Sequence, residues 1–330
     1  HEKDTMTGTV AWLFPGQGSQ AVGMARSLAE SWTSARDVLV VAEATYAGPL
    51  TSVMFEGPAE ALQETVTTQP AIVSASLAAL AALREAWHAR HGSDLPDPVL
   101  VAGHSVGEFS AVAASGATDV ATALRLTCER ARLMQWAGET IPGTMAAVLG
   151  LDVDRVEASC EQARAAVAGS YVTVANHNAV SPAQVVIAGD AAGIDDATER
   201  CKAAGARRVV PLAVGGAFHS PAMAPAREGL ARAVAMAVVG DARVPIVANV
   251  TGVAIRRQRE IRAELSEQVT SRVRWADSMA TLAAAGCTRF IEFGAGAVLS
   301  GLVQRAIPGA EAIQIGDAEG VARAVEWLTQ

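Results

Sequence analysis

The sequence has few cysteines, and none is spaced like a metal ligand or a redox pair. The four cysteines, Cys128, Cys160, Cys201 and Cys287, lie far apart, with no CxxC pair and no histidine-rich segment. Small secreted domains carry dense cysteine frameworks, and structural zinc sites need closely spaced cysteine or histidine pairs. We therefore expect neither disulfides nor a metal site, and we expect the protein to act in the cytoplasm.

The sequence also lacks an excess of positive charge. With 26 Lys and Arg against 34 Asp and Glu, its formal net charge is −8. Nucleic acid is bound by clustered basic residues that neutralise phosphates, so this balance argues against nucleic acid as the main partner. Two arginine pairs, Arg207–Arg208 and Arg256–Arg257, are candidates for a small basic patch, although solvated surface charge is the simpler interpretation.

A hydrophobic run long enough to cross a membrane is missing as well. The longest candidate, Ala71–Leu83, contains two serines and ends at Arg84, short of the ~20 apolar residues that a bilayer requires. We predict a buried helix there and no membrane association. The chain starts with a polar segment that has no apolar signal core, so we expect Met6 to be the native start and residues 1–5 a remnant of cloning.

What is present is a pattern of apolar strands and helices typical of a globular α/β enzyme. Apolar residues make up 51% of the 330 residues. Residues 9–14 and 99–103 are apolar runs that end at glycine turns, which predicts parallel strands followed by loops and helices. A loop region is predicted between the first strand and a helix at 69–90. We also expect a helix at 221–238, strands at 245–250 and 289–293, and a helix at 320–328.

Between residues 145 and 214 the pattern changes to βαββαβ, the ferredoxin-like order. The expected strands are 145–149, 172–174, 184–188 and 208–212, and the expected helices are 152–168 and 191–204, with Asp152 or Asp154 as cap of the first. We therefore predict an α/β fold with two parts. An α/β-hydrolase-like large domain with a parallel sheet (6–134 and 215–330) carries an inserted ferredoxin-like subdomain (135–214).

One glycine-flanked serine follows the second predicted strand. Gly103-His104-Ser105-Val106-Gly107 matches the G-x-S-x-G nucleophile elbow, in which glycines let neighbouring backbone pass close to a sharp turn. The helix that follows directs N–H groups and the positive end of its dipole towards the hydroxyl. Since the pattern lies between a strand and a helix, we predict that Ser105 is a nucleophile.

A serine hydroxyl needs a base, and elimination among the six histidines favours His219. It follows a strand and lies in Gly215-Gly-Ala-Phe-His-Ser220, where glycines allow close approach. No acid is distinguished as a third member, so a backbone carbonyl is an alternative orienting group. The other histidines have simpler interpretations: His1 belongs to the leader, His88 and His91 to a charged helix end, His177 to a structural position, and His104 diverges from its neighbour Ser105.

A second glycine loop, Phe14-Pro-Gly-Gln-Gly-Ser-Gln20, follows the first predicted strand. It lacks the lysine of a phosphate loop and the spacing of a dinucleotide fingerprint, so we do not expect a nucleotide site. A loop at this edge of the sheet can instead supply a backbone N–H to the active site. A simple tight turn is the alternative.

The ordered motifs together resemble the malonyl-CoA:acyl-carrier-protein transacylase family, which includes acyltransferase domains and stand-alone transacylases of polyketide synthesis. The resemblance runs from about residue 9 to about residue 306. Its marks are Phe-Pro-Gly-Gln-Gly-Ser-Gln (14–20), Thr-Gln-Pro-Ala (68–71), Gly-His-Ser-Val-Gly-Glu (103–108), Arg130 four residues before Met134, Met-Ala-Ala-Val (145–148), Gln-Val-Val-Ile-Ala-Gly (184–189), Ala-Phe-His-Ser (217–220), Val-Arg-Trp (273–275) and Glu-Phe-Gly-Ala-Gly (292–296).

The resemblance implies a role for several residues. Ser105 would be acylated with His219 as its base, and the backbone N–H groups of Gln17 and Val106 would form the oxyanion hole. Arg130 would bind the malonyl carboxylate, for which a guanidinium is the suitable charged, bidentate partner. Without the resemblance, Arg130 would pass for a surface helix residue.

The resemblance also implies supporting contacts. The carbonyl of Arg274 would orient His219, and Gln69 and Asn178 would add polar contacts. Phe218 before the histidine, with Val106 after the serine, resembles the malonyl-selective pattern, because a bulky Phe would crowd a C2 substituent. One departure concerns the segment 178–184, which is longer than the family pattern and leaves the placement of Asn178 open.

The implied reaction is a ping-pong transfer of malonyl from CoA to an acyl carrier protein by a monomer that needs no cofactor. Three alternatives stay open: an acyl-thioester hydrolase, which would not need Arg130; a transferase for another acyl chain, from carrier to carrier; and a non-catalytic carrier-docking module. The sequence does not distinguish fatty-acid from polyketide synthesis, or a free-standing enzyme from part of a larger synthase.

Overall fold

A parallel sheet forms the centre of the computed structural model, which describes residues 9–329; the expected start at Met6 lies outside these residues. The sheet has six strands in the order β10-β9-β1-β2-β7-β8. All neighbouring pairs are parallel except β7 and β8. The strands are β1 Val10–Phe14, β2 Leu100–Gly103, β7 Ile246–Val247, β8 Ala254–Ile255, β9 Arg289–Phe293 and β10 Glu311–Ile315.

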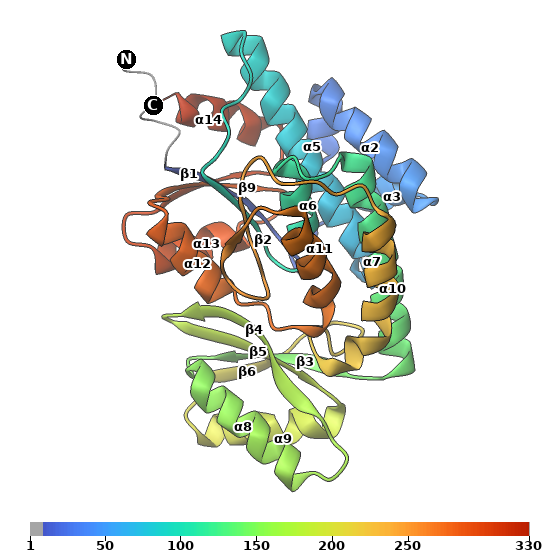
Figure 1. Ribbon diagram of the computed structural model, residues 1–330, viewed down its shortest axis with the longest axis vertical. Helices are drawn as coiled ribbons and strands as arrows, with labels where there is room; N and C mark the ends of the chain where they lie inside the picture. Colours follow the sequence, from blue (N-terminus) through green and yellow to red (C-terminus); the bar gives the residue numbers. More distant parts are fainter. Residues whose placement is uncertain (1–8, 330) are drawn as a thin grey trace.

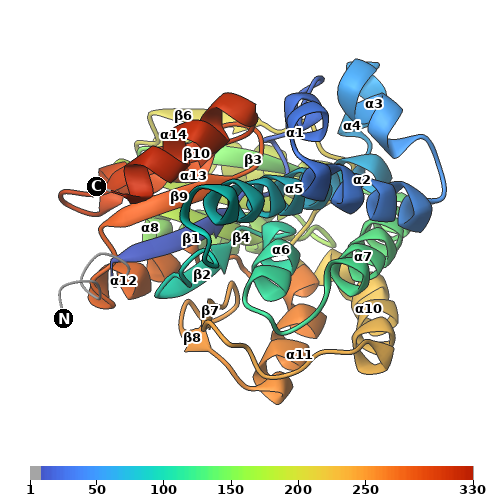
Figure 2. The same cartoon turned by 90° about the horizontal axis from the view of Figure 1, so that it is seen from above.

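Helices cover both faces of this sheet, which is why its central strands β1 and β2 are apolar throughout rather than alternating. In β1, Trp12 and Phe14 point into one core cluster and Ala11 and Leu13 into another. Figure 1 shows α5 and α14 above the sheet and α12 and α13 below it, and Figure 2 shows α5 running along the sheet. These helices are α5 Thr65–His91, α12 Trp275–Ala284, α13 Val298–Ala306 and α14 Ala318–Leu328.

Helix α5 is long and apolar enough by composition to cross a membrane. However, 89% of its most apolar window is buried inside the protein. The core helix of a globular domain has this composition, and the predicted buried helix is confirmed.

Four helices, α1 to α4, occupy the region between β1 and α5 that was predicted as loop, and that prediction was wrong. Helix α2 buries Ala35, Val38, Leu39 and Ala42 at helical spacing. The four are α1 Arg26–Ser31, α2 Thr33–Tyr46, α3 Leu50–Glu56 and α4 Ala59–Gln63. The other helices of this part are α6 Gly107–Ala114, α7 Val120–Thr140, η1 Pro221–Met223, α10 Ala224–Met236, α11 Gln258–Glu267 and η2 Gln268–Thr270.

A second, antiparallel sheet lies at the lower end of the molecule in Figure 1, with two helices on its far side. Its strand order is β4-β5-β3-β6, and the predicted order βαββαβ is confirmed. Asp152 caps the first helix by accepting a hydrogen bond from the Arg155 N–H at 3.0 Å. The elements are β3 Thr144–Leu149, α8 Val153–Ala166, β4 Val172–Val180, β5 Ala183–Gly189, α9 Ala191–Ala203 and β6 Arg208–Pro211.

Strand β4 is longer than the predicted strand 172–174. Its extra length accounts for the segment 178–184, which is longer than the family pattern. It continues to Val180 and turns directly into β5 at Ala183, with irregular register at two points. The added residues therefore lengthen a hairpin. Asn178 lies on this strand rather than in a loose loop.

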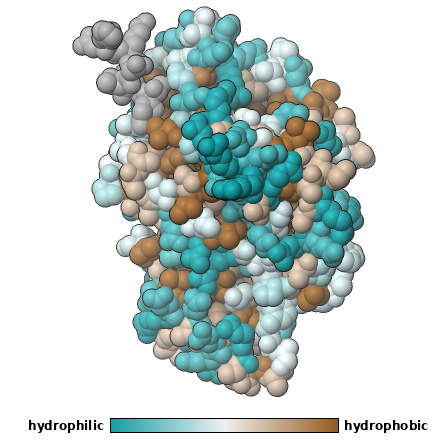
Figure 3. Space-filling model, viewed as in Figure 1, coloured by the Kyte–Doolittle hydropathy of each residue, from teal (hydrophilic) through white to brown (hydrophobic). Residues whose placement is uncertain are grey.

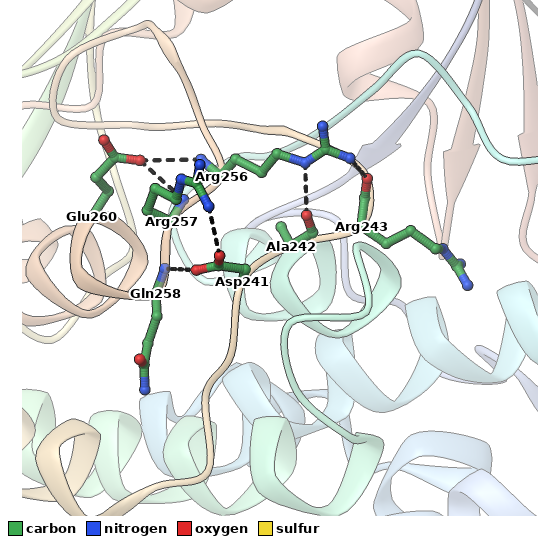
Figure 4. Close-up of polar contacts among 7 residues, drawn as sticks. All are labelled: Asp241, Ala242, Arg243, Arg256, Arg257, Gln258 and Glu260. Carbon is green, nitrogen blue, oxygen red and sulfur yellow. Dashed lines mark hydrogen bonds and ion pairs between the residues drawn. The ribbon is translucent and has the colours of Figure 1, made fainter.

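The pair Arg256–Arg257 holds backbone in place and is not a free basic patch (Figure 4). Arg256 donates to the carbonyls of Ala242 and Arg243, and Arg257 pairs with Asp241 at 3.0 Å. Glu260 accepts from the N–H groups of both arginines. These contacts fix the first turn of α11, the helix that leads to η2 and the active site.

The face of the molecule shown in Figure 3 carries its apolar residues in small groups. On the face shown in Figure 3, hydrophobic residues are scattered among hydrophilic ones. The most exposed large apolar side chains within the described residues are those of Met236, at the end of α10, and Val238, just after it. Such scattering is ordinary for protein surfaces. The expected monomer stays a prediction.

Candidate active site

Ser105 lies on a strained turn between β2 and α6, as the glycine pattern predicts. Its φ is 50°, a left-handed value that residues other than glycine rarely adopt. A Cβ on Gly103 would lie 2.1 Å from the carbonyl oxygen of Gly107, and one on Gly107 would lie 2.1 Å from that of Phe14. Only glycine fits at these two positions, so the elbow depends on both.

His219 lies beside Ser105, with its Nε2 2.7 Å from the serine Oγ. Its φ of 55° is also left-handed. On the other side of the ring, Nδ1 faces the carbonyls of Gln268 at 2.9 Å and Ser271 at 3.1 Å. Carbonyls only accept, so Nδ1 carries the proton and Nε2 is free to accept one from Ser105.

The expected role of Arg274 in orienting His219 is wrong. Arg274 is the N-cap of α12, and its carbonyl accepts from the Ser278 N–H at 2.9 Å. The orienting carbonyls belong instead to Gln268 and Ser271, in and just after η2. The Arg274 side chain is half-exposed and pairs with Asp277 at 3.6 Å, so it is not among the residues that line the active-site cavity.

The charge state of His219 is set by its surroundings. Burial, and then the positive charge of Arg130, lower the pKa of His219 to about 3, against the opposing effect of the two carbonyls. The imidazole is therefore neutral near neutral pH, as a base must be.

Arg130 comes from the middle of α7 and is 1% exposed. Its Nη2 lies 3.1 Å from Ser105 Oγ and its Nη1 donates to Gln69 Oε1 at 2.6 Å. Gln268 Oε1 accepts from Nε at 3.1 Å and from Nη2 at 2.8 Å. Burial lowers the pKa of Arg130 to about 9, which still leaves it charged at neutral pH, and Glu108 opposes that shift. A fixed guanidinium thus stands directly beside the nucleophile, and the alternative of a surface residue is wrong.

Two backbone N–H groups next to Ser105 are available to bind a ligand atom. Within residues 9–329, neither the Gln17 N–H nor the Val106 N–H has a hydrogen-bond partner, and both residues line the cavity with Ser105. The Gln17 loop packs closely on the elbow, since a Cβ on Gly16 would lie 2.5 Å from the His104 carbonyl oxygen. Free donors next to a nucleophile are what an oxyanion requires.

The cavity above Ser105 has a volume of about 420 Å³ and is lined by both sheets' elements. Phe218 lines it with only 5% of its surface exposed. Asn178 reaches it from β4, and its Oδ1 accepts from His104 Nε2 at 2.9 Å. Burial lowers the pKa of His104, and the bond to Asn178 opposes this shift. His104 therefore binds Asn178 rather than Ser105, as its predicted divergence implies.

Sequence reasoning missed four residues that support the site. Gln268 contributes both its carbonyl and its side chain. Asn249 Oδ1 accepts from the Ser105 N–H at 2.7 Å. Glu108, the last residue of the Gly-His-Ser-Val-Gly-Glu motif, is fully buried next to Asn249. Glu264, on α11, accepts from the Val250 N–H at 2.9 Å and lies close to Glu108.

No cluster of three or more His, Cys, Asp or Glu side chains suited to a metal ion occurs within the described part of the chain. The polar groups around Ser105 include its hydroxyl, the His219 imidazole, the Arg130 guanidinium and the N–H groups of Gln17 and Val106. This set is suited to acyl transfer onto a serine.

The chain matches the model of a protein family described as the acyl transferase domain, over residues 11–322. The malonyl CoA-acyl carrier protein transacylase of Bacillus subtilis (strain 168) is 37% identical, over 97% of this chain and 98% of the relative. The protein of the same name from Escherichia coli (strain K12) is also 37% identical, over 96% of this chain and 98% of the relative.

Solved structures agree with these relatives. The acyl-carrier-protein-S-malonyltransferase of Bartonella henselae superimposes with a TM-score of 0.89 at 34% identity, covering 97% of this chain and 99% of that one. A type II PKS acyl-carrier protein in complex with its malonyl-transacylase matches with a TM-score of 0.87 at 34% identity, over 96% of this chain and 99% of that one.

Proposed function

Because this chain belongs to the acyl transferase domain family, we propose that it transfers a malonyl group from CoA to the phosphopantetheine thiol of an acyl carrier protein. Both named relatives are malonyl CoA-acyl carrier protein transacylases, and one solved neighbour is bound to its carrier protein. The observation that carries the proposal is the buried Arg130 guanidinium 3.1 Å from Ser105 Oγ.

In the first half-reaction Ser105 attacks the malonyl thioester. His219 Nε2 takes the hydroxyl proton as the Oγ–carbon bond forms, and the N–H groups of Gln17 and Val106 stabilise the oxyanion. The carbon–sulfur bond then breaks, and the imidazolium returns the proton to the CoA sulfur. In the second half-reaction the carrier thiol gives its proton to His219 Nε2 and attacks the malonyl ester carbon. The carbon–Oγ bond then breaks, and His219 returns the proton to Ser105.

Arg130 binds the malonyl carboxylate and so decides which acyl chains are accepted. Its N–H groups already lie beside Ser105 Oγ. Since the malonyl chain is short, the carboxylate of a malonyl group attached to Oγ would lie within their reach. Gln69 and Asn178 supply further polar groups to the cavity, and Phe218 restricts the space for a substituent at C2. Discrimination against one extra methyl is worth ~1–3 kcal/mol, so methylmalonyl should be disfavoured rather than excluded.

A hydrolase is the second candidate, and the same arginine argues against it. A hydrolase that clears arbitrary acyl groups has no use for a buried cation beside its nucleophile. Transfer between thioesters is chemically complete with the nucleophile, base and donors described, so we infer no resident cofactor. A transferase for another carboxylated chain, from carrier to carrier, is compatible with Arg130 and is an outcome of the test below.

We also infer that the large part, described over residues 9–134 and 215–329, is α/β-hydrolase-like, and that residues 135–214 form a ferredoxin-like subdomain. The elbow at the end of β2 supports the first assignment. The order β4-β5-β3-β6 supports the second, because it is the order of a βαββαβ unit whose first and third strands are central. Free, mostly buried cysteines support a cytoplasmic protein.

The test is intact-mass measurement after the protein is mixed with a panel of malonyl-CoA, methylmalonyl-CoA and acetyl-CoA. We expect malonylation of the wild type, loss of the adduct in Ser105→Ala, and transfer to added carrier protein with little free malonate. Acylation of Ser105→Ala, or release of free acid in place of acyl-carrier, would contradict the proposal.

A further inference from the structure

The side-chain amide of Gln268 lies between hydrogen-bond acceptors on one side, from Ser105 and Glu108, and the donors of Arg130 on the other. Its Nε2 donates to the Ser105 carbonyl at 3.0 Å and to Glu108 Oε2. Its Oε1 accepts from Arg130 Nε and Nη2. The fully buried Gln268 amide therefore links the Ser105 elbow, the Arg130 guanidinium (the carboxylate clamp) and the buried Glu108 side chain.

The direction of this amide is decided by its partners. A guanidinium only donates, so Arg130 requires Oε1. The Ser105 carbonyl only accepts, so it requires Nε2, and Glu108 Oε2 accepts from the same Nε2. The reversed amide would place Nε2 against the guanidinium and leave Oε1 facing oxygen.

Glu108 is held in place independently of Gln268. Its side chain is fully buried, and its Oε1 accepts from the Asn249 N–H at 2.9 Å and from Asn249 Nδ2 at 3.0 Å. Burial, and then the neighbouring carboxyl of Glu264, raise the pKa of Glu108. The Glu108 carboxyl in turn opposes the lowering of the Arg130 pKa, which limits the cost of burying that cation.

We propose that Glu108 is a positioning residue that sets selectivity for carboxylated acyl chains. By holding Nε2 of Gln268 it turns Oε1 towards Arg130 and keeps the guanidinium aimed at Ser105. The proposal rests on the proposed function, since it concerns the residue that binds the malonyl carboxylate. An acyl chain without a carboxylate does not need Arg130 and should not depend on Glu108.

Two isosteric substitutions in the same carboxyl pair test this. In Glu108→Gln the new amide keeps its oxygen on Asn249 and presents N–H groups to Gln268, so the Gln268 amide reverses and repels Arg130. In Glu264→Gln the Glu108 carboxylate keeps all its donors, so Gln268 keeps its direction. The two variants remove the same functional group at neighbouring buried positions.

The measurement is the ratio of kcat/KM for serine acylation by malonyl-CoA to that by acetyl-CoA. We expect Glu108→Gln to lower this ratio ~10-fold or more, as for the loss of a hydrogen-bonded charged contact, and Glu264→Gln to leave it within ~2-fold of wild type. A mere packing defect would slow both acyl donors alike. Equal losses for both donors, an unchanged ratio in Glu108→Gln, or the same fall in both variants would overturn the proposal.

A third variant covers failure of Glu108→Gln to fold. Gln268→Met removes the amide while the backbone carbonyl continues to orient His219, so it should lower the same ratio without abolishing acetylation. An unchanged ratio would overturn the proposal as well. If wild type were not malonylated at all, the proposed function would fail instead, and that result is separate.

Discussion

The rate of Ser105 acylation should stay nearly constant as the pH is lowered from about 8 to about 5. His219 can accept the serine proton only while its Nε2 is free. Burial, and then the charge of Arg130, lower the pKa of His219 to about 3. The base is therefore ready over the whole range, without the loss on the acid side that an exposed histidine would give.

The size of the difference follows from the two pKa values. An imidazole with an ordinary pKa of ~6.5 would be ~97% protonated at about pH 5, and acylation would slow ~30-fold. With a pKa of about 3, ~99% of His219 stays neutral at that pH, so kcat/KM should change by less than ~2-fold.

The assay is rapid-quench mixing with acyl-CoA followed by intact-mass measurement across this pH range. Arg130→Gln is the matched variant, because it removes the cation that helps to lower the pKa of His219. Assayed with acetyl-CoA, which needs no carboxylate clamp, it should show an acid limb at higher pH than wild type. A wild-type limb centred near ~6.5 would refute the description of His219 as a desolvated, neutral base.

Three further substitutions test, in turn, the arginine that binds the carboxylate, the turn that carries Ser105, and a helix cap away from the active site. Arg130→Lys should lower kcat/KM for malonyl-CoA ~10–100-fold and affect acetyl-CoA less, because an ammonium cannot reproduce the planar fork; the acylation assay checks this. Gly107→Ala should lower the free energy of unfolding by about 3 kcal/mol or more in urea titration, since its Cβ would meet the Phe14 carbonyl at 2.1 Å. Asp119→Ala should cost ~1 kcal/mol in the same titration with acylation unchanged, because Asp119 caps α7 through the Thr122 N–H at 2.6 Å.

The elbow could be predicted from sequence because its constraints are local. A sharp turn with close backbone passage requires glycine at fixed offsets from the serine, and the structure places backbone atoms where a Cβ at either glycine would lie. The order βαββαβ was predictable for a similar reason, since each strand and helix shows its own periodicity. The amphipathic spacing of α2 was equally readable and was missed.

Arg130 shows what periodicity cannot reveal. A charged residue in a helix of mixed polarity is usually at the surface, and its burial here depends on three acceptors from distant segments: Gln69, Ser105 and Gln268. The sequence separations are 61, 25 and 138 residues. The resemblance to a family, not the local pattern, identified this residue.

The orienting group of His219 was misplaced for a deeper reason. Every residue has a carbonyl, so the sequence carries no mark of which one accepts from Nδ1. The choice depends on which carbonyls lie next to the ring: that of Arg274 accepts from the Ser278 N–H in the first turn of α12, while those of Gln268 and Ser271, around η2, lie within hydrogen-bond distance of Nδ1. Because Gln268 also holds Arg130 through its side chain, one residue sets the position of both the base and the clamp. A substitution at 268 should therefore disturb the clamp first, since any residue retains the carbonyl that the base needs.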